Sequence, residues 1–197
     1  MRRALAVPVL AAAIAGSASG CSSDATATIV QPTCSAGAQG SPGNGVILMA
    51  QSVPSAAWVP CMRTALPIGW SFDFLEARNT GAHFYLDSDR DGQHAIEVRL
   101  DRSCNTTGAT EIPSDRTGQR RLERVTMTSP HFEGERYYVF DGGCISMVFR
   151  LTGQSRGEPL ALATDSVGAV SRAEVQKRVH DESNGRLQLD PVSDGNG

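Results

Sequence analysis

Three aspartates at alternate positions form the segment that comes nearest to a metal site. Asp87, Asp89 and Asp91 precede Gly92 in LDSDRDGQHAI, which is the opening pattern of a calcium loop, D-x-D-x-D-G. An EF-hand also needs a carboxylate at the twelfth loop position, which is Val98 here, and flanking helices, so it is excluded. Two interpretations stay open: a looser calcium site that adds backbone carbonyls, and a hairpin loop whose aspartates accept hydrogen bonds from turn amides. We favour the hairpin loop.

A second candidate for chemistry is a histidine beside a carboxylate. If the strands pair by their apolar faces, His83 lies opposite Glu97 on the outward face, where a carboxylate-held imidazole could act as a general base. A solvated cross-strand contact is the commoner role of such a pair. The sequence contains none of the motifs G-x-S-x-G, S-x-x-K, H-E-x-x-H or a P-loop. We therefore expect no cofactor and leave the catalytic residues unassigned.

Two hairpins are predicted to position these residues. In the first, apolar residues alternate with polar ones, and matching the apolar faces pairs Leu86 with His94, Phe84 with Ile96 and Ala82 with Val98. This register leaves residues 88–92 as the loop. In the second, Asp141-Gly142-Gly143 is the turn signal, and one apolar face is expected to hold Tyr138, Phe140, Ile145, Met147 and Phe149. Residues 121–129 are a further strand candidate.

The remaining segments predict short elements around the hairpins. The continuous apolar run at 45–51 indicates a buried strand, and Pro60 is expected to open a short helix. Helices are predicted over 158–168 and 171–183, the second beginning with the capping box of Ser171 and Glu174. Residues 187–191 could return as a strand. Four aromatic residues are expected to build core: Trp58, Trp70, Phe72 and Phe74. The predicted fold class is α+β, an antiparallel sheet built from hairpins with one or two C-terminal helices.

The N-terminus has the order of an export signal. Arg2 and Arg3 precede an apolar run at residues 4–15, and small residues lead to Cys21. The run is shorter than the roughly 20 residues that span a bilayer. The tetrapeptide Ala18-Ser19-Gly20-Cys21 has the pattern of a bacterial lipobox, so we expect a signal peptide over 1–20 and lipid attachment at Cys21. Ordinary secretion with a free Cys21 thiol is the alternative.

Four cysteines remain after such cleavage, and an even number in an exported chain indicates two disulfides. Of three connectivities we favour Cys34–Cys61 and Cys104–Cys144. No pair of cysteines has C-x-x-C spacing, which argues against thioredoxin-like redox activity and against zinc binding by these thiols.

Composition divides the chain and limits its partners. Residues 21–45 are rich in Ser, Thr, Gly and Pro and are expected to form a flexible tether, followed by a single domain over 46–191 and a disordered tail over 192–197. The net charge is −3, and losing Arg2 and Arg3 leaves 18 − 2 = 16 basic against 21 acidic residues, or −5. A mildly acidic domain without a basic run is a poor nucleic-acid binder. Membrane contact is expected through the lipid alone.

Three segments carry a family resemblance: VPCMRTALPIGW, YLDSDRDG and YYVFDGGCISMVFRL. Together they resemble a group of uncharacterised exported or membrane-attached proteins of high-GC actinobacteria, over residues 53–151. The resemblance implies an extracytoplasmic, cysteine-stapled domain and no particular reaction.

The leading functional hypothesis is a lipid-anchored module on the outer face of the cell membrane that binds an unknown envelope ligand or protein without catalysis. A cell-envelope hydrolase using His83 and Glu97 or the Asp87–Asp91 loop is one alternative. A calcium-stabilised surface adhesive domain is another.

Overall fold

The computed structural model describes residues 25–35, 44–63, 65–152 and 157–191. The predicted signal peptide, Cys21 and the predicted tail lie outside these residues. Within them, no helix is both long enough and apolar enough to cross a membrane.

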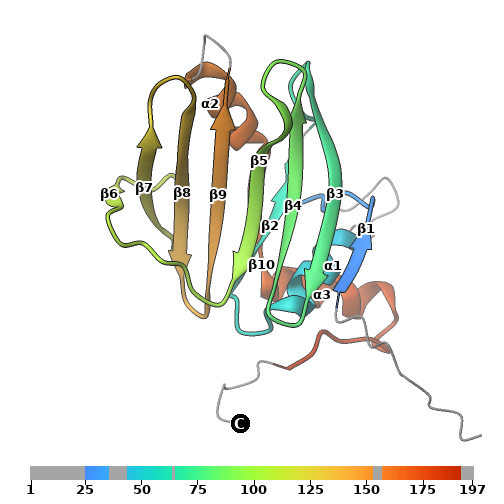
Figure 1. The fold of residues 1–197 in the computed structure, drawn as a ribbon. Coiled ribbons are helices and arrows are strands. Elements are labelled where there is room, and N and C mark those ends of the chain that lie inside the picture. Colours follow the sequence, from blue (N-terminus) through green and yellow to red (C-terminus); the bar gives the residue numbers. More distant parts are fainter. Residues whose placement is uncertain (1–24, 36–43, 64, 153–156, 192–197) are drawn as a thin grey trace, which may run out of the picture.

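An eight-stranded antiparallel sheet forms the front layer in Figure 1, with strand order β1-β3-β4-β5-β9-β8-β7-β6. Two antiparallel meanders, β3-β4-β5 and β7-β8-β9, meet where β5 pairs with β9. The strands are β1 (Ala25–Thr28), β3 (Trp70–Arg78), β4 (Gly81–Ser88), β5 (Gly92–Asp101), β6 (Thr110–Ile112), β7 (Arg120–Met127), β8 (Phe132–Phe140) and β9 (Gly143–Leu151).

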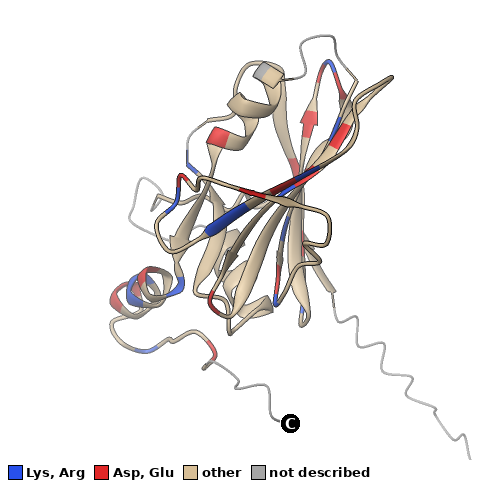
Figure 2. Ribbon diagram, turned by 90° about the vertical axis from the view of Figure 1, so that its left-hand side faces the viewer, with Lys and Arg blue, Asp and Glu red and all other residues tan. Residues whose placement is uncertain are grey.

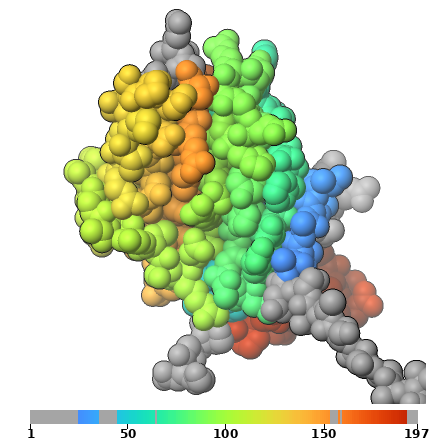
Figure 3. All heavy atoms as spheres, in the orientation of Figure 1, coloured from blue at the N-terminus to red at the C-terminus, as the bar shows by residue number. Residues whose placement is uncertain are grey.

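A second layer lies behind one face of this sheet. It contains helices α1 (Asn44–Ser52), α2 (Gly157–Ser166) and α3 (Arg172–Glu182), and a two-stranded sheet of β2 (Trp58–Met62) and β10 (Val167–Ser171). Figure 2 shows these elements gathered on one side of the strands. In Figure 3 the strands' own side chains form the surface of the opposite side, which we call the uncovered face.

The main core fills the space between the layers. Phe84, Leu86, Ile96, Val98 and Met147 are fully buried there, because strand alternation turns one side chain in two toward the helices. Burying such side chains stabilises the fold by about 1.5–3 kcal/mol each. The apolar residues that were predicted to share the core-facing side of each hairpin are buried between the layers.

The predicted disulfides Cys34–Cys61 and Cys104–Cys144 are both present. Ser171 is the N-cap of α3 as predicted, since its hydroxyl accepts a hydrogen bond from the Glu174 amide at 3.1 Å. The Glu174 carboxylate binds Arg178 instead of completing the capping box. The α+β class and the mainly antiparallel sheet are as expected.

Several element predictions were wrong. The apolar run at 45–51 belongs to helix α1, and Pro60 lies in strand β2 rather than at the start of a helix. Pro60 is tolerated because β2 belongs to a sheet of only two strands, where a missing amide donor interrupts little. Gly168 lies inside strand β10 rather than closing α2, and residues 187–191 form no strand. Residues 25–28, assigned to the tether, form edge strand β1 on β3.

The register of the first hairpin differs from the prediction by two residues. Leu86 pairs with Ile96 and Ser88 with Gly92, so Asp87 alone lies opposite the three residues 93–95. This bulge places His94 in the left-handed region, at φ 54°. A shift of two residues keeps the regularly paired side chains on their predicted faces but changes their partners, and His83 therefore lies opposite Arg99 rather than Glu97. His94 is the exception: it was expected opposite Leu86 on the apolar face, but the bulge turns its ring onto Tyr85 on the other face.

Candidate functional site

The uncovered face carries the polar side chains of the central strands. On β4 and β5 they alternate with the core residues and comprise His83, Tyr85, Asp87, Glu97, Arg99 and Asp101. The face continues over β9, β8 and β7, where Val148 pairs with Glu135 and Glu135 with Arg124. The whole surface is thus built by strand parity, and none of the helices in the described residues covers it.

Four rings cluster at the β3–β4–β5 side of this face. Tyr85 stacks on His94 with ring centroids 4.0 Å apart and lies 5.2 Å from His83. Phe74 contacts both Tyr85, at 5.1 Å, and His94, at 5.9 Å. Phe74 was expected in the core, but the β3–β4 register shifts between Phe72 and Leu75, and Phe74 joins these rings instead. We call Phe74, His83, Tyr85 and His94 the ring cluster.

Charges beside the ring cluster are arranged in pairs. Arg99 binds Glu97 at 2.6 Å, and this hydrogen bond raises the pKa of Arg99. Burial, followed by the charge of Glu97, raises the pKa of Tyr85. Burial also raises the pKa of Asp101. Glu97 is therefore engaged with Arg99 and holds no histidine.

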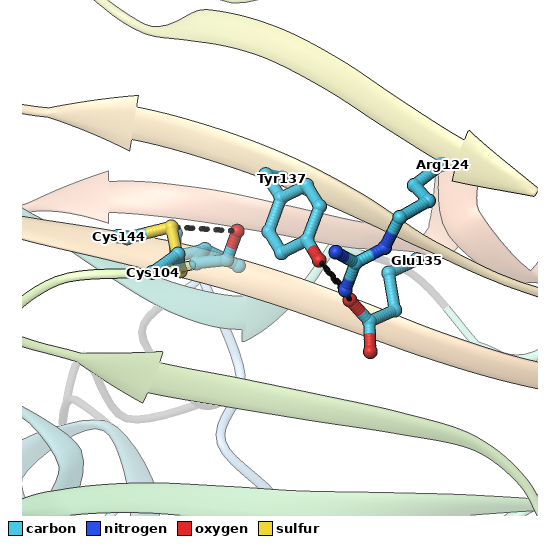
Figure 4. Close-up of a disulfide and its surroundings, with 6 residues drawn as sticks. Cys104, Arg124, Glu135, Tyr137 and Cys144 are labelled. Atoms are coloured by element: carbon cyan, nitrogen blue, oxygen red, sulfur yellow. Dashed lines mark hydrogen bonds and ion pairs between the residues drawn. A yellow bond between two sulfur atoms is a disulfide. The ribbon is translucent and has the colours of Figure 1, made fainter. Parts of the chain in front are cut away.

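The disulfide side of the face forms a separate polar corner, drawn in Figure 4. Arg124 donates to Glu135 at 2.5 Å and to the Tyr137 hydroxyl at 2.8 Å, and that hydroxyl donates to Glu135. Cys144, Tyr137 and Leu122 form a small second core against Cys104. A hollow of about 190 Å³ lies between this corner and Asp101.

The three loop aspartates do not converge on one point. Asp87 accepts from the His94 amide at 2.7 Å, whereas Asp91 accepts from the Thr152 amide at 2.7 Å. The Asp89 carboxylate lies against Gly69, whose carbonyl accepts from the Asp89 amide at 2.8 Å. These contacts agree with the interpretation as turn-supporting aspartates.

A different set of residues comes together at the bulge. Ligand atoms of Asp73, Asp87 and His94 all lie within 4.8 Å of one another, and in the described part of the chain they are the only such group of His, Cys, Asp and Glu side chains. His94 Nε2 lies 3.0 Å from Asp73 Oδ2, and both side chains are partly open to solvent. Sequence reasoning missed Asp73, a lone acid in the aromatic strand WSFDF, because the β3–β4 irregularity that positions it has no clear signal.

The two remaining histidines, His131 and His180, are not members of this group. His131 lines a hollow of about 390 Å³ with His94, Glu133 and Arg150. His180 is on α3, where its ring nitrogen lies 3.8 Å from the Asp181 carboxylate.

Comparisons with known proteins leave the family open. No family model matches the chain, and no curated protein sequence matches it. A solved crystal structure from Bacteroides thetaiotaomicron is similar at a TM-score of 0.31 and 9% identity, over 59% of this chain. The matched part spans 46% of that protein's length, and a likeness this weak supports no conclusion about fold or function.

Proposed function

We propose that the protein is a lipid-anchored, extracytoplasmic binding module whose uncovered face contacts a partner in the cell envelope. The observation that carries this proposal is the ring cluster, which lies beside ion-paired side chains on the sheet face that no described helix covers. Aromatic residues at the centre with a polar rim are the usual anatomy of a binding surface.

The proposed location is supported by the two disulfides, which persist in oxidising compartments. Attachment is proposed through acylation of Cys21. Only residues 22–24 would then separate the lipid on Cys21 from the folded domain, because strand β1 begins at Ala25. The edge of the sheet at β1 is thereby held close to the membrane.

A photo-crosslinking amino acid at position 85 tests the proposed face in intact cells. We expect covalent adducts from this position and none from position 180, which lies on helix α3 of the other layer. Equal adducts from both positions, or none from position 85, would contradict a partner on the uncovered face.

The hydrolase alternative would now depend on different residues. His83 and Glu97 are not paired, whereas His94 meets Asp73 and Asp87. The two carboxylates could orient His94 as a general base, but the three side chains lie on the open surface rather than in a cleft that excludes water. Hydrolysis of envelope polymers by the wild-type protein, lost in His94→Asn, would favour this alternative over a binding module.

A further inference from the structure

We infer that Asp73, Asp87 and His94 form a binding site for a divalent transition-metal ion, with Zn²⁺ as the best match. Such a site would exist at the bulge whether or not the uncovered face binds an envelope partner.

The donor set favours this class of ion. An imidazole and two carboxylates are common ligands of Zn²⁺, and three protein ligands leave an open coordination position. Calcium takes six to eight oxygen ligands and has no preference for imidazole nitrogen. The His94–Asp73 separation of 3.0 Å is close to the about 3.3 Å expected between two ligands of tetrahedral zinc.

The charges around the bulge also favour a cation. On this face Glu97, Glu111 and Glu135 each have an arginine partner at 2.5–2.6 Å. Among the described residues, neither Asp73 nor Asp87 forms an ion pair with arginine or lysine. A divalent ion would neutralise the two carboxylates, beside which the described residues place the His94 imidazole but no arginine or lysine.

The imidazole is held in place before any ion arrives. The His94 amide is bound to Asp87, its ring stacks on Tyr85, and its backbone is fixed at φ 54° by the bulge. Ligands ordered in advance lose less conformational freedom on binding.

Calorimetric titration of tag-free, oxidised protein with ZnCl₂ tests the site. We expect one ion per chain, and about 10-fold or greater loss of affinity in His94→Asn and Asp73→Asn. Asparagine is chosen at 94 because it tolerates the left-handed backbone conformation. Asp87→Asn is a third variant, since its amide oxygen still accepts from the His94 amide.

His180→Asn is the matched control, because it removes an imidazole from α3 and is expected to leave zinc affinity within about twofold. Urea unfolding without metal confirms that each variant is folded. Absence of zinc binding by the wild-type protein would overturn the site, as would equal affinity in all variants. Binding of CaCl₂ in preference to ZnCl₂ would overturn the class of ion and favour a calcium-stabilised domain.

Discussion

The guanidinium carbon of Arg116 lies 3.8 Å from the centre of the Tyr138 ring, inside the protein. Arg116 also donates to the Val167 carbonyl at 2.6 Å, while the Tyr138 hydroxyl donates to Asp115 at 3.2 Å. Burial lowers the pKa of Arg116, and the Tyr138 ring and the nearby Asp115 carboxylate partly offset the cost of its buried charge. The pair joins the loop before β7 to both layers of the fold.

Replacing the ring should therefore destabilise the protein through Arg116. Tyr138→Leu is expected to lower the free energy of unfolding by about 3 kcal/mol, whereas Tyr138→Phe keeps the π face and should lower it by about 1 kcal/mol. A double-mutant cycle with Arg116→Met should give a coupling of about 1–2 kcal/mol in urea unfolding. Strict additivity would show that the stacked pair contributes nothing.

The turn between β8 and β9 should not tolerate a side chain at its second residue. Gly142 has φ 70°, and a Cβ atom there would lie 1.8 Å from the Ser55 carbonyl oxygen. Gly142→Ala is expected to reduce stability by more than about 2 kcal/mol by thermal or urea unfolding. Gly157→Ala, where an added Cβ meets no atom within 4 Å, is the control and should change stability by less than about 0.5 kcal/mol. Similar stabilities for both variants would contradict this packing.

Acid should weaken the fold through Glu123. Burial raises the pKa of this carboxyl, but hydrogen bonds from Arg121 and Arg136 outweigh it, and the net pKa is lowered from 4.5. A carboxyl with a lowered folded-state pKa stabilises the fold above its unfolded value, and this stability is lost as pH falls through the folded value. The contribution of Glu123 to the free energy of unfolding should thus be constant above about pH 5 and fall below about pH 4.5. In urea unfolding between pH 3 and 7, the free energy of unfolding of Glu123→Gln should fall less steeply with decreasing pH than that of the wild-type protein. The same pH dependence in both proteins would contradict this role of Glu123.

Removing the second disulfide should be costly because it closes a long loop. Cys104 and Cys144 are 40 residues apart, for which loop-closure entropy corresponds to about 3–4 kcal/mol. The Cys104→Ala/Cys144→Ala variant should lose about this much in urea unfolding, while Cys21→Ser should lose none. A loss below about 1 kcal/mol would mean that the loop is held by its small core with Leu122 and Tyr137.

Elements with strong local signals could be predicted from the sequence. The alternation of Phe84 and Leu86 with polar residues gave the covered face of the hairpin, and Ser171 with Glu174 gave the start of α3. In contrast, the run at 45–51 is apolar throughout, so it has no period that separates a buried helix from a buried strand. The segment forms helix α1, whose residues Val46, Met49 and Ala50 pack into the core.

The candidate site was less accessible to prediction than the fold. Asp87 and His94 were both noted, but the bulge that brings them together depends on how β4 and β5 accommodate extra residues. Asp73 lies on β3, outside the predicted β4–β5 hairpin. It approaches His94 because the β3–β4 register shifts between Phe72 and Leu75. Such irregularities are set by the whole sheet rather than by local residue patterns.

Export and anchoring underlie the proposed function, and intact-mass spectrometry of the protein from membranes tests them most directly. We expect a chain that begins at Cys21, carries the added mass of acyl chains, and lacks four hydrogens because both disulfides are formed. A full-length chain with an uncut leader and five reduced thiols, recovered from the cytoplasm, would contradict the account.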